Sequence, residues 1–213
     1  MIKVFIADDH ALFREGLRQV LEENPDIAVT DEASSGQEVL EKVSTNDYDI
    51  LLLDIAMPGM SGLDVLKQLK SLKPRLRVLV LSMYPEEQYA VRAIKAGAVG
   101  YLTKRSASGE LVTAIRKVSE GRTYISTSIT EKLILDLEPD RDRPLHEKLS
   151  DREYQILCMI AWGKTVSEIA KELFLSVKTV STHRGHILEK MRMKTNAEIT
   201  NYAIKRGLIC MTD

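Results

Sequence analysis

Five polar residues of this sequence stand at, or just after, the ends of short apolar runs. They are Asp8, Asp9, Asp54, Ser82 and Lys104. Carboxylate oxygens are the ligands that a hard divalent cation such as Mg²⁺ prefers. Three carboxylates in one crevice would repel each other without a cation. The residue types therefore predict a magnesium site at Asp8, Asp9 and Asp54, provided that the fold brings them together.

The same set can transfer a phosphoryl group. A carboxylate is a recognised covalent nucleophile, so Asp54 is the expected acceptor. Lys104 would hold the phosphoryl oxygens as a point charge, and Ser82 would donate a hydrogen bond to another oxygen. Taken singly, an aspartate at a strand end is more often a turn residue or a helix cap, and a lone lysine is usually solvated. Only the full set on one edge of a sheet favours the chemical interpretation.

Alternating strand and helix patterns position this set. Continuous apolar runs, such as those at 50–53 and 78–81, are typical of parallel strands buried on both faces. Five strand–helix units across residues 1–120 predict an α/β fold with a doubly wound, five-stranded parallel sheet. Ligands of such sheets bind outside the carboxyl ends of the strands. The polar residues lie where that rule puts them.

The rest of the chain has a different pattern. Residues 121–148 carry a weak helical pattern and then a charged segment at 138–144 that is bracketed by prolines, which is typical of a linker. From Leu149 onward the pattern is only helical. We therefore predict a domain at 1–120, a linker with a helix at 121–148, and a small all-α domain at 149–213.

The second domain contains a candidate DNA-binding motif. Residues 166–191 can fold as two helices joined by a tight turn, with Ser176 as the N-cap of the second helix. Small and basic residues near the start of that helix suit the major groove. The candidate contacts to bases and phosphates are Lys178, Thr179, Ser181, Thr182, His183, Arg184 and Lys190. The alternative is a four-helix packing module with a charged solvent face.

The charge balance fits two divided roles. The net charge is −1, but residues 1–120 carry 15 basic and 18 acidic side chains, whereas residues 149–213 carry 10 basic and 7 acidic ones. The basic part suits phosphates. Two cysteines, Cys158 and Cys210, are too few for a disulfide scaffold or a zinc site of their own. Since no apolar run approaches the roughly 18 residues of a membrane span, we expect a soluble, cytoplasmic protein.

Residues 1–120 resemble the receiver domain of response regulators. The matching motifs are Asp8-Asp9, the segment DIAMPGMSG at 54–62, Ser82 and Lys104. The resemblance implies a flavodoxin-like fold and phosphotransfer to Asp54 from a sensor histidine kinase. It implies that Ser82 and Tyr101 move together on phosphorylation. It also implies that Mg²⁺ is bound by Asp9, Asp54 and the main-chain carbonyl of Ala56.

Residues 149–209 resemble the LuxR/NarL-type helix-turn-helix domain. The matching segments are LSDRE at 149–153, SEIA at 167–170, Leu175-Ser176, Thr179-Val180 and His183. In that family the helix beginning near Val177 is the recognition helix, and the last helix helps to pair two DNA-binding domains. Gly185 falls where a base-reading residue is expected, but it has no side chain to read with. We therefore expect Arg184 or its neighbours to carry more of the readout.

Together these features predict a NarL/FixJ-type transcriptional response regulator, in which phosphorylation of Asp54 controls dimerisation and sequence-specific DNA binding. The expected partners are a sensor histidine kinase, duplex promoter DNA, a second copy of the chain and RNA polymerase, with no membrane. An aspartate-nucleophile phosphatase usually carries a second carboxylate two residues after the nucleophile, where this chain has Ala56, so we do not expect an enzyme. A regulator that binds DNA without phosphorylation is disfavoured by the intact acidic set.

Overall fold

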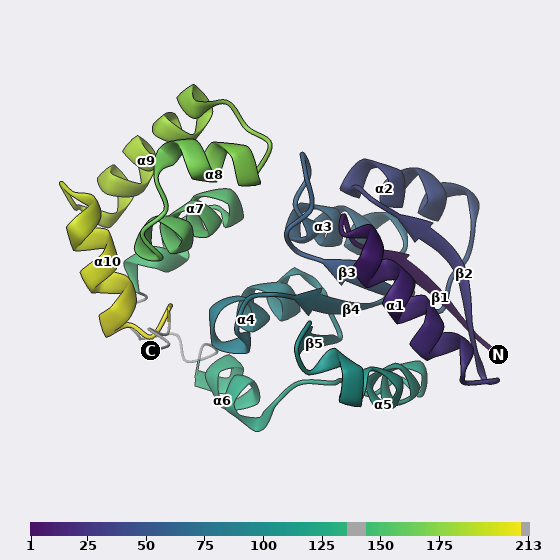
Figure 1. Ribbon diagram of the computed structural model, residues 1–213. Helices are drawn as coiled ribbons and strands as arrows, with labels where there is room; N and C mark the ends of the chain where they lie inside the picture. Colours follow the sequence, from purple (N-terminus) through teal and green to yellow (C-terminus); the bar gives the residue numbers. More distant parts are fainter. Residues whose placement is uncertain (136–143, 210–213) are drawn as a thin grey trace. The chain divides into compact units, whose positions relative to one another are not determined.

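The computed structural model describes residues 1–135 and 144–209 (Figure 1). The chain divides into two compact units, Met1–Leu135 and Asp136–Asp213. The first unit is α/β, and the described part of the second is helical. Most of the charged segment predicted for the linker lies outside the described residues, as does Cys210.

A five-stranded parallel sheet forms the centre of the first unit. Its strands run in the order β2-β1-β3-β4-β5, with bounds β1 Ile2–Ala7, β2 Ile27–Ala33, β3 Ile50–Asp54, β4 Arg77–Ser82 and β5 Gly100–Thr103. Every residue of β3 is buried, because helices cover both faces of the sheet. The strand order reverses between β1 and β3, and such switch points bind ligands. The predicted doubly wound sheet is confirmed.

Five helices cover this sheet, with bounds α1 Ala11–Glu22, α2 Gly36–Thr45, α3 Gly62–Leu72, α4 Glu86–Ala96 and α5 Ala107–Ser119. On one face, Leu17 and Leu21 of α1 and Leu111 and Ile115 of α5 join the strand side chains in one core. On the other face, α3 lies between α2 and α4 (Figure 1). The side chain of Ser35 caps α2 by accepting a main-chain N–H, so a local signal begins that helix.

Residues after α5 extend the sheet at its outer edge. Tyr124 forms a parallel bridge with Gly100. The N–H of Tyr124 donates to the Val99 carbonyl at 2.9 Å, and its carbonyl accepts from the Tyr101 N–H at 3.0 Å. The helix α6, Thr127–Leu135, then packs on α4. The helix that we expected inside a linker therefore lies in the first unit.

The described part of the second unit is built from one short 3-10 turn and four helices. Their bounds are η1 Leu145–Lys148, α7 Asp151–Ala161, α8 Val166–Glu172, α9 Val177–Met191 and α10 Asn196–Lys205. Ser176 caps α9, so the predicted helix-turn-helix of α8 and α9 is confirmed. In the turn, Phe174 has a left-handed φ of 54° and an exposed side chain. No helix in the described ranges is long and apolar enough to cross a membrane.

Candidate functional site

The carboxyl ends of the central strands bring four predicted residues together. Asp54 ends β3, Ser82 ends β4, Asp8 follows β1 and Lys104 follows β5. All four are buried. The Lys104 ammonium lies 2.6 Å from Asp8 Oδ2 and 2.7 Å from Asp54 Oδ2. One cation therefore contacts two buried carboxylates at the edge where a parallel sheet binds its ligands.

Further contacts fix the position of Lys104. Its main-chain N–H donates to the Ser82 carbonyl at 2.7 Å. Its Nζ lies 4.8 Å from the centre of the Phe13 ring, which is within cation–π range. A buried ammonium is costly unless it is paired, so the carboxylates keep the charged side chain inside.

Burial dominates the electrostatics of this site. Removal from water raises the pKa of the Asp54 carboxyl; the positive charge of Lys104 opposes this shift, and the negative charge of Asp8 adds to it. Burial by itself would lower the pKa of Lys104, but the two carboxylates outweigh burial and raise it. Lys104 therefore stays protonated, and the crowded carboxylates attract further positive charge.

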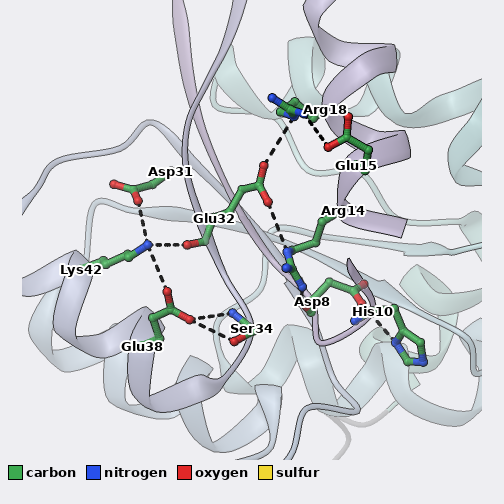
Figure 2. Close-up of polar contacts among 10 residues, drawn as sticks. All are labelled: Asp8, His10, Arg14, Glu15, Arg18, Asp31, Glu32, Ser34, Glu38 and Lys42. Carbon is green, nitrogen blue, oxygen red and sulfur yellow. Dashed lines mark hydrogen bonds and ion pairs between the residues drawn. The ribbon is translucent and has the colours of Figure 1, made fainter. Parts of the chain in front are cut away.

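Two neighbouring side chains shape the loop after β1 (Figure 2). His10 donates its main-chain N–H to Asp8 Oδ1 at 2.9 Å, and its ring Nδ1 lies 2.8 Å from Asp9 Oδ1. Arg14 of α1 donates to the Asp8 carbonyl at 2.6 Å and to Glu32 Oε2 at 3.2 Å. The loop is thus tied to both α1 and β2, and its carboxylates stay at the sheet edge.

The acidic residues fit a hard divalent cation. Asp8, Asp9, His10 and Asp54 each offer one ligand atom, and these atoms lie within 4.8 Å of one another. Three of these ligands are carboxylates, which suits Mg²⁺. Ala56, implied as a main-chain ligand, donates its N–H to Asp54 Oδ1 at 3.2 Å. That bond ties the loop after β3 to the carboxylate of Asp54.

Ser82 and Tyr101 are linked through the loop after β4. Ser82 Oγ accepts the Tyr84 N–H at 3.2 Å, and the Tyr101 hydroxyl donates to the Tyr84 carbonyl at 2.9 Å. Burial raises the pKa of the Tyr101 phenol, so this hydroxyl remains a donor at neutral pH. The two predicted switch residues therefore contact the same segment between β4 and α4.

The predicted DNA-binding residues of α9 fall into two groups, one on its solvent-facing side and one that contacts neighbouring helices. Thr179, near the start of the helix, lies at the edge of the first group. Thr179 is half-buried, and its Oγ1 lies 2.7 Å from Ser176 Oγ. Helical spacing of three and four residues places a solvent-facing set along one side of α9. That exposed set is Lys178, Ser181, Thr182 and Gly185.

The other group contacts neighbouring helices. Lys190 donates to both carboxylate oxygens of the buried Glu153, at 2.7 and 2.8 Å. Arg184 Nε donates to Asn196 Oδ1 of α10 at 2.6 Å. His183 is half-buried near Glu153, and burial lowers the pKa of its ring. These three side chains are therefore engaged within the second unit.

Two family models match the chain, one in each unit. Residues 4–116 match the response regulator receiver domain, and residues 147–203 match the bacterial regulatory proteins of the luxR family. The chain belongs to the LuxR-type response regulators. It combines a receiver domain with a LuxR-type DNA-binding domain, as in NarL/FixJ-type transcriptional regulators.

Relatives of this response regulator match it over nearly its whole length. Response regulator UvrY of Escherichia coli strain K12 is 37% identical over 209 residues, covering 98% of this chain and 96% of UvrY. Oxygen regulatory protein NreC of Staphylococcus carnosus is 36% identical over 215 residues, covering 98% and 99%. The RcsB response regulator of Salmonella typhimurium aligns with a TM-score of 0.57 at 26% identity, covering 96% and 98%. A structure of two RcsB dimers bound to two parallel DNAs aligns with a TM-score of 0.58 at 26% identity, covering 95% and 98%.

Sequence reasoning missed residues that position both sites of this response regulator. His10 and Arg14 hold the loop of the first carboxylates, and Glu153 and Asn196 hold side chains of α9. His10 carried a weak signal, because it directly follows the two aspartates. Glu153 carried only the signal of a helix cap, and its pairing with a side chain far along the chain had no local signal.

Proposed function

We propose that Asp54 accepts a phosphoryl group from a sensor histidine kinase, and that this event controls dimerisation and promoter binding. The observation that carries the proposal is the Lys104 ammonium, which lies within 2.7 Å of carboxylate oxygens of both Asp54 and Asp8. A cation so placed can bind phosphoryl oxygens. The ordinary alternative, a solvated lysine, would not be buried between two carboxylates.

In the proposed reaction, an Asp54 oxygen forms a bond to phosphorus while the phosphorus–nitrogen bond of a donor phosphohistidine breaks. The leaving imidazole keeps the electron pair and takes up a proton. Lys104 neutralises charge on the phosphoryl oxygens, and Ser82 at the end of β4 supplies a hydroxyl donor. Mg²⁺, bound by the acidic residues and the Ala56 carbonyl, supplies further charge neutralisation when present.

We assign regulation rather than enzymatic turnover to this site. Ala56 stands two residues after Asp54, where an aspartate-nucleophile phosphatase usually has an acid/base carboxylate. Ala56 offers only main-chain groups, and its N–H donates to Asp54 Oδ1. The matched family is one of DNA-binding transcription regulators, which supports the same assignment.

Phosphorylation would act on the contacts between Ser82, Tyr84 and Tyr101. A phosphoryl group adds about −1.5 to −2 charge at neutral pH, next to Lys104 and at the end of β3. The Tyr101 N–H donates to the Tyr124 carbonyl just before α6, so a movement of Tyr101 would reach α6 through the backbone. The different contacts of the two states supply the shift toward a dimer.

The exposed side of α9 is the proposed recognition surface. Lys178, Ser181 and Thr182 would contact base edges and phosphates in the major groove, with Thr179 at the start of the helix. We assign His183, Arg184 and Lys190 mainly to positioning α9, because their side chains contact its neighbours. Two such helices in a dimer would meet half-sites about one helical turn apart. This activity belongs in the cytoplasm, with RNA polymerase as a further partner.

The phosphoacceptor assignment is tested by incubating the full chain with acetyl phosphate and Mg²⁺ and measuring its intact mass. The wild-type chain should gain one phosphoryl group, and Asp54→Asn should gain none, because an amide is not a nucleophile for this transfer. Asp47→Asn is the matched control, since Asp47 is exposed and lies outside the acidic site. Asp47→Asn should gain one phosphoryl group like the wild type, and an adduct that persists in Asp54→Asn would overturn the assignment.

A further inference from the structure

A second cluster of metal-binding side chains lies in the helical unit, apart from the acidic site. Glu153 of α7 and His183 and His186 of α9 each offer one ligand atom, and these atoms lie within 4.8 Å of one another. Glu153 Oε1 is 3.9 Å from His186 Nδ1. The two histidines are three residues apart on one helix, which places them as neighbours on its surface. Helix packing adds the carboxylate from α7.

One atom of this cluster has an unmet bonding requirement. Nδ1 of His183 is buried and has no hydrogen-bond partner within the part of the chain that the structure describes. A buried polar atom without a partner destabilises the fold in general, and neither the proposed phosphotransfer nor the proposed DNA reading uses this atom. A metal ion coordinated by Nδ1 would supply the missing partner, since a neutral imidazole nitrogen is a common metal ligand.

Two imidazoles and one carboxylate match a known coordination chemistry. Zinc ions with three protein ligands take this set and keep a fourth position open to water. Mg²⁺ and Ca²⁺ prefer oxygen ligands, so they do not suit two histidines. We propose that Glu153, His183 and His186 bind a divalent transition-metal ion of the zinc class. Tetrahedral ligand atoms lie about 3.3 Å apart, so small side-chain rotations must close the cluster.

Lys190 competes with a metal ion for Glu153. Its ammonium lies 2.8 Å from Oε1 and 2.7 Å from Oε2. Oε2 also accepts the Ser150 N–H at 2.8 Å as part of the helix cap. The metal ion would therefore take Oε1 and displace Lys190, while the cap stays in place. Metal binding and the Glu153–Lys190 ion pair are alternatives, and this competition distinguishes the site from an exposed pair of histidines.

The test uses the full chain with excess Mg²⁺, which saturates the acidic receiver site. Co²⁺ is titrated as the probe, because tetrahedral Co²⁺ absorbs visible light far more strongly than octahedral Co²⁺, and Zn²⁺ is then added as a competitor. We expect one strongly absorbing Co²⁺ per chain, displaced by Zn²⁺. His186→Ala should weaken binding by at least about tenfold, and it should leave the fold intact because that side chain is 56% exposed.

Two further variants decide between this site and its alternatives. Lys190→Met removes the competing ammonium, so it should tighten Co²⁺ binding and make the second unit's melting temperature more dependent on Zn²⁺. His10→Ala, in the receiver site, should leave Co²⁺ absorption unchanged. The inference is wrong if the wild-type chain shows no strong absorption, if His10→Ala abolishes it, or if Lys190→Met does not tighten binding. None of these outcomes depends on the role of Asp54.

Discussion

Lys42 and Lys104 each contact two acidic side chains, but water reaches them to different extents. Lys104 is buried with its partners. The side chain of Lys42 is 32% exposed, and its Nζ lies 3.0 Å from Asp31 Oδ1 and 3.1 Å from Glu38 Oε1 (Figure 2). Water screening limits a partly exposed pair to about 1 kcal/mol. Lys42 therefore forms a modest structural ion pair, whereas Lys104 belongs to a buried site.

The Lys42 cluster should contribute a pH-dependent part of stability. Burial by itself would raise the pKa of Asp31, but hydrogen bonds from Tyr48 and Lys42 outweigh burial and lower that pKa below its ordinary 3.8. The Ser34 N–H and Lys42 lower the pKa of Glu38 below 4.5. Groups with lowered pKa stabilise the fold above their ordinary pKa and lose this contribution as pH falls through the folded values. Lys42→Met should therefore cost about 1 kcal/mol of unfolding free energy at pH 7 and clearly less near pH 3.

Urea unfolding of both chains at the two pH values measures this difference. Circular dichroism reports both units, whereas Trp162, the single tryptophan of the chain, reports only the second unit. The Trp162 transition should be unchanged and serves as an internal reference. A cost of Lys42→Met that is equal at both pH values would contradict the ionic explanation.

The outer edge of β5 connects Tyr101, the proposed switch residue, to the segment that precedes α6. The bridge at Tyr124 requires a close backbone approach at Gly100. A Cβ at Gly100 would lie 2.8 Å from the Tyr124 carbonyl oxygen and 2.7 Å from Leu79 Cδ1. Since the first of these atoms is backbone, the contact cannot be relieved by rotating a side chain. The glycine is therefore needed for the bridge.

Gly100→Ala should separate Tyr124 from β5. We expect a loss of about 1–3 kcal/mol in the unfolding free energy of the first unit, as for other overpacked positions. Amide hydrogen exchange should become faster at Tyr101 and Tyr124. Gly16→Ala is the control, because nothing lies within 4 Å of its added Cβ and alanine favours the α1 helix. Unchanged exchange at Tyr124 in Gly100→Ala would show that the bridge does not depend on this approach.

The proposed recognition surface can be tested within one helix, α9. Lys178 is exposed on the proposed DNA-reading side of α9, so Lys178→Ala should weaken binding to duplex DNA. It should also reduce the slope of log affinity against log salt by about 1, as for one lost phosphate contact. Lys205→Ala removes the same charge from an exposed position on α10 and should leave the slope unchanged. Equal slopes for both variants, measured by fluorescence anisotropy, would count against this surface.

At the scale of the whole molecule, the proposed phosphoacceptor and the proposed DNA-reading surface belong to different units. The acidic site lies in the first unit, and the exposed side of α9 lies in the second. The proposed function therefore requires a signal to pass between the units, and dimerisation is the proposed route. In one solved structure, two dimers of the similar regulator RcsB are bound to two parallel DNAs.

Activation should change the assembly state. With acetyl phosphate and Mg²⁺, light scattering should show a shift from the molar mass of one chain toward that of two. Asp54→Asn should remain at the mass of one chain under the same conditions, while the Trp162 unfolding transition stays unchanged. If the molar mass of the wild-type assembly is the same with and without acetyl phosphate, phosphorylation does not control dimerisation.

Much of the first unit was predictable because its signals are local. Buried strands appear as continuous apolar runs, and Asp54, Ser82 and Lys104 stand at or just after their ends. Once a parallel sheet is inferred, its topology brings those ends to one edge. The sheet and the helix-turn-helix are confirmed, whereas the roles of Asp54 and the α9 residues remain predictions for the experiments above.

The sequence by itself therefore determined the order of elements, the two motifs and the composition of the acidic edge. Only the tertiary structure decided which charged residues of α9 have partners on other helices, since Lys178 lies on the solvent-facing side of α9 while Lys190, which is also exposed, pairs with Glu153, 37 residues away. It also decided that α6 packs on α4, and that two histidines meet a carboxylate from another helix. The reason is physical: periodicity and capping depend on residues within a few positions, whereas ion pairs and ligand clusters depend on packing between distant segments.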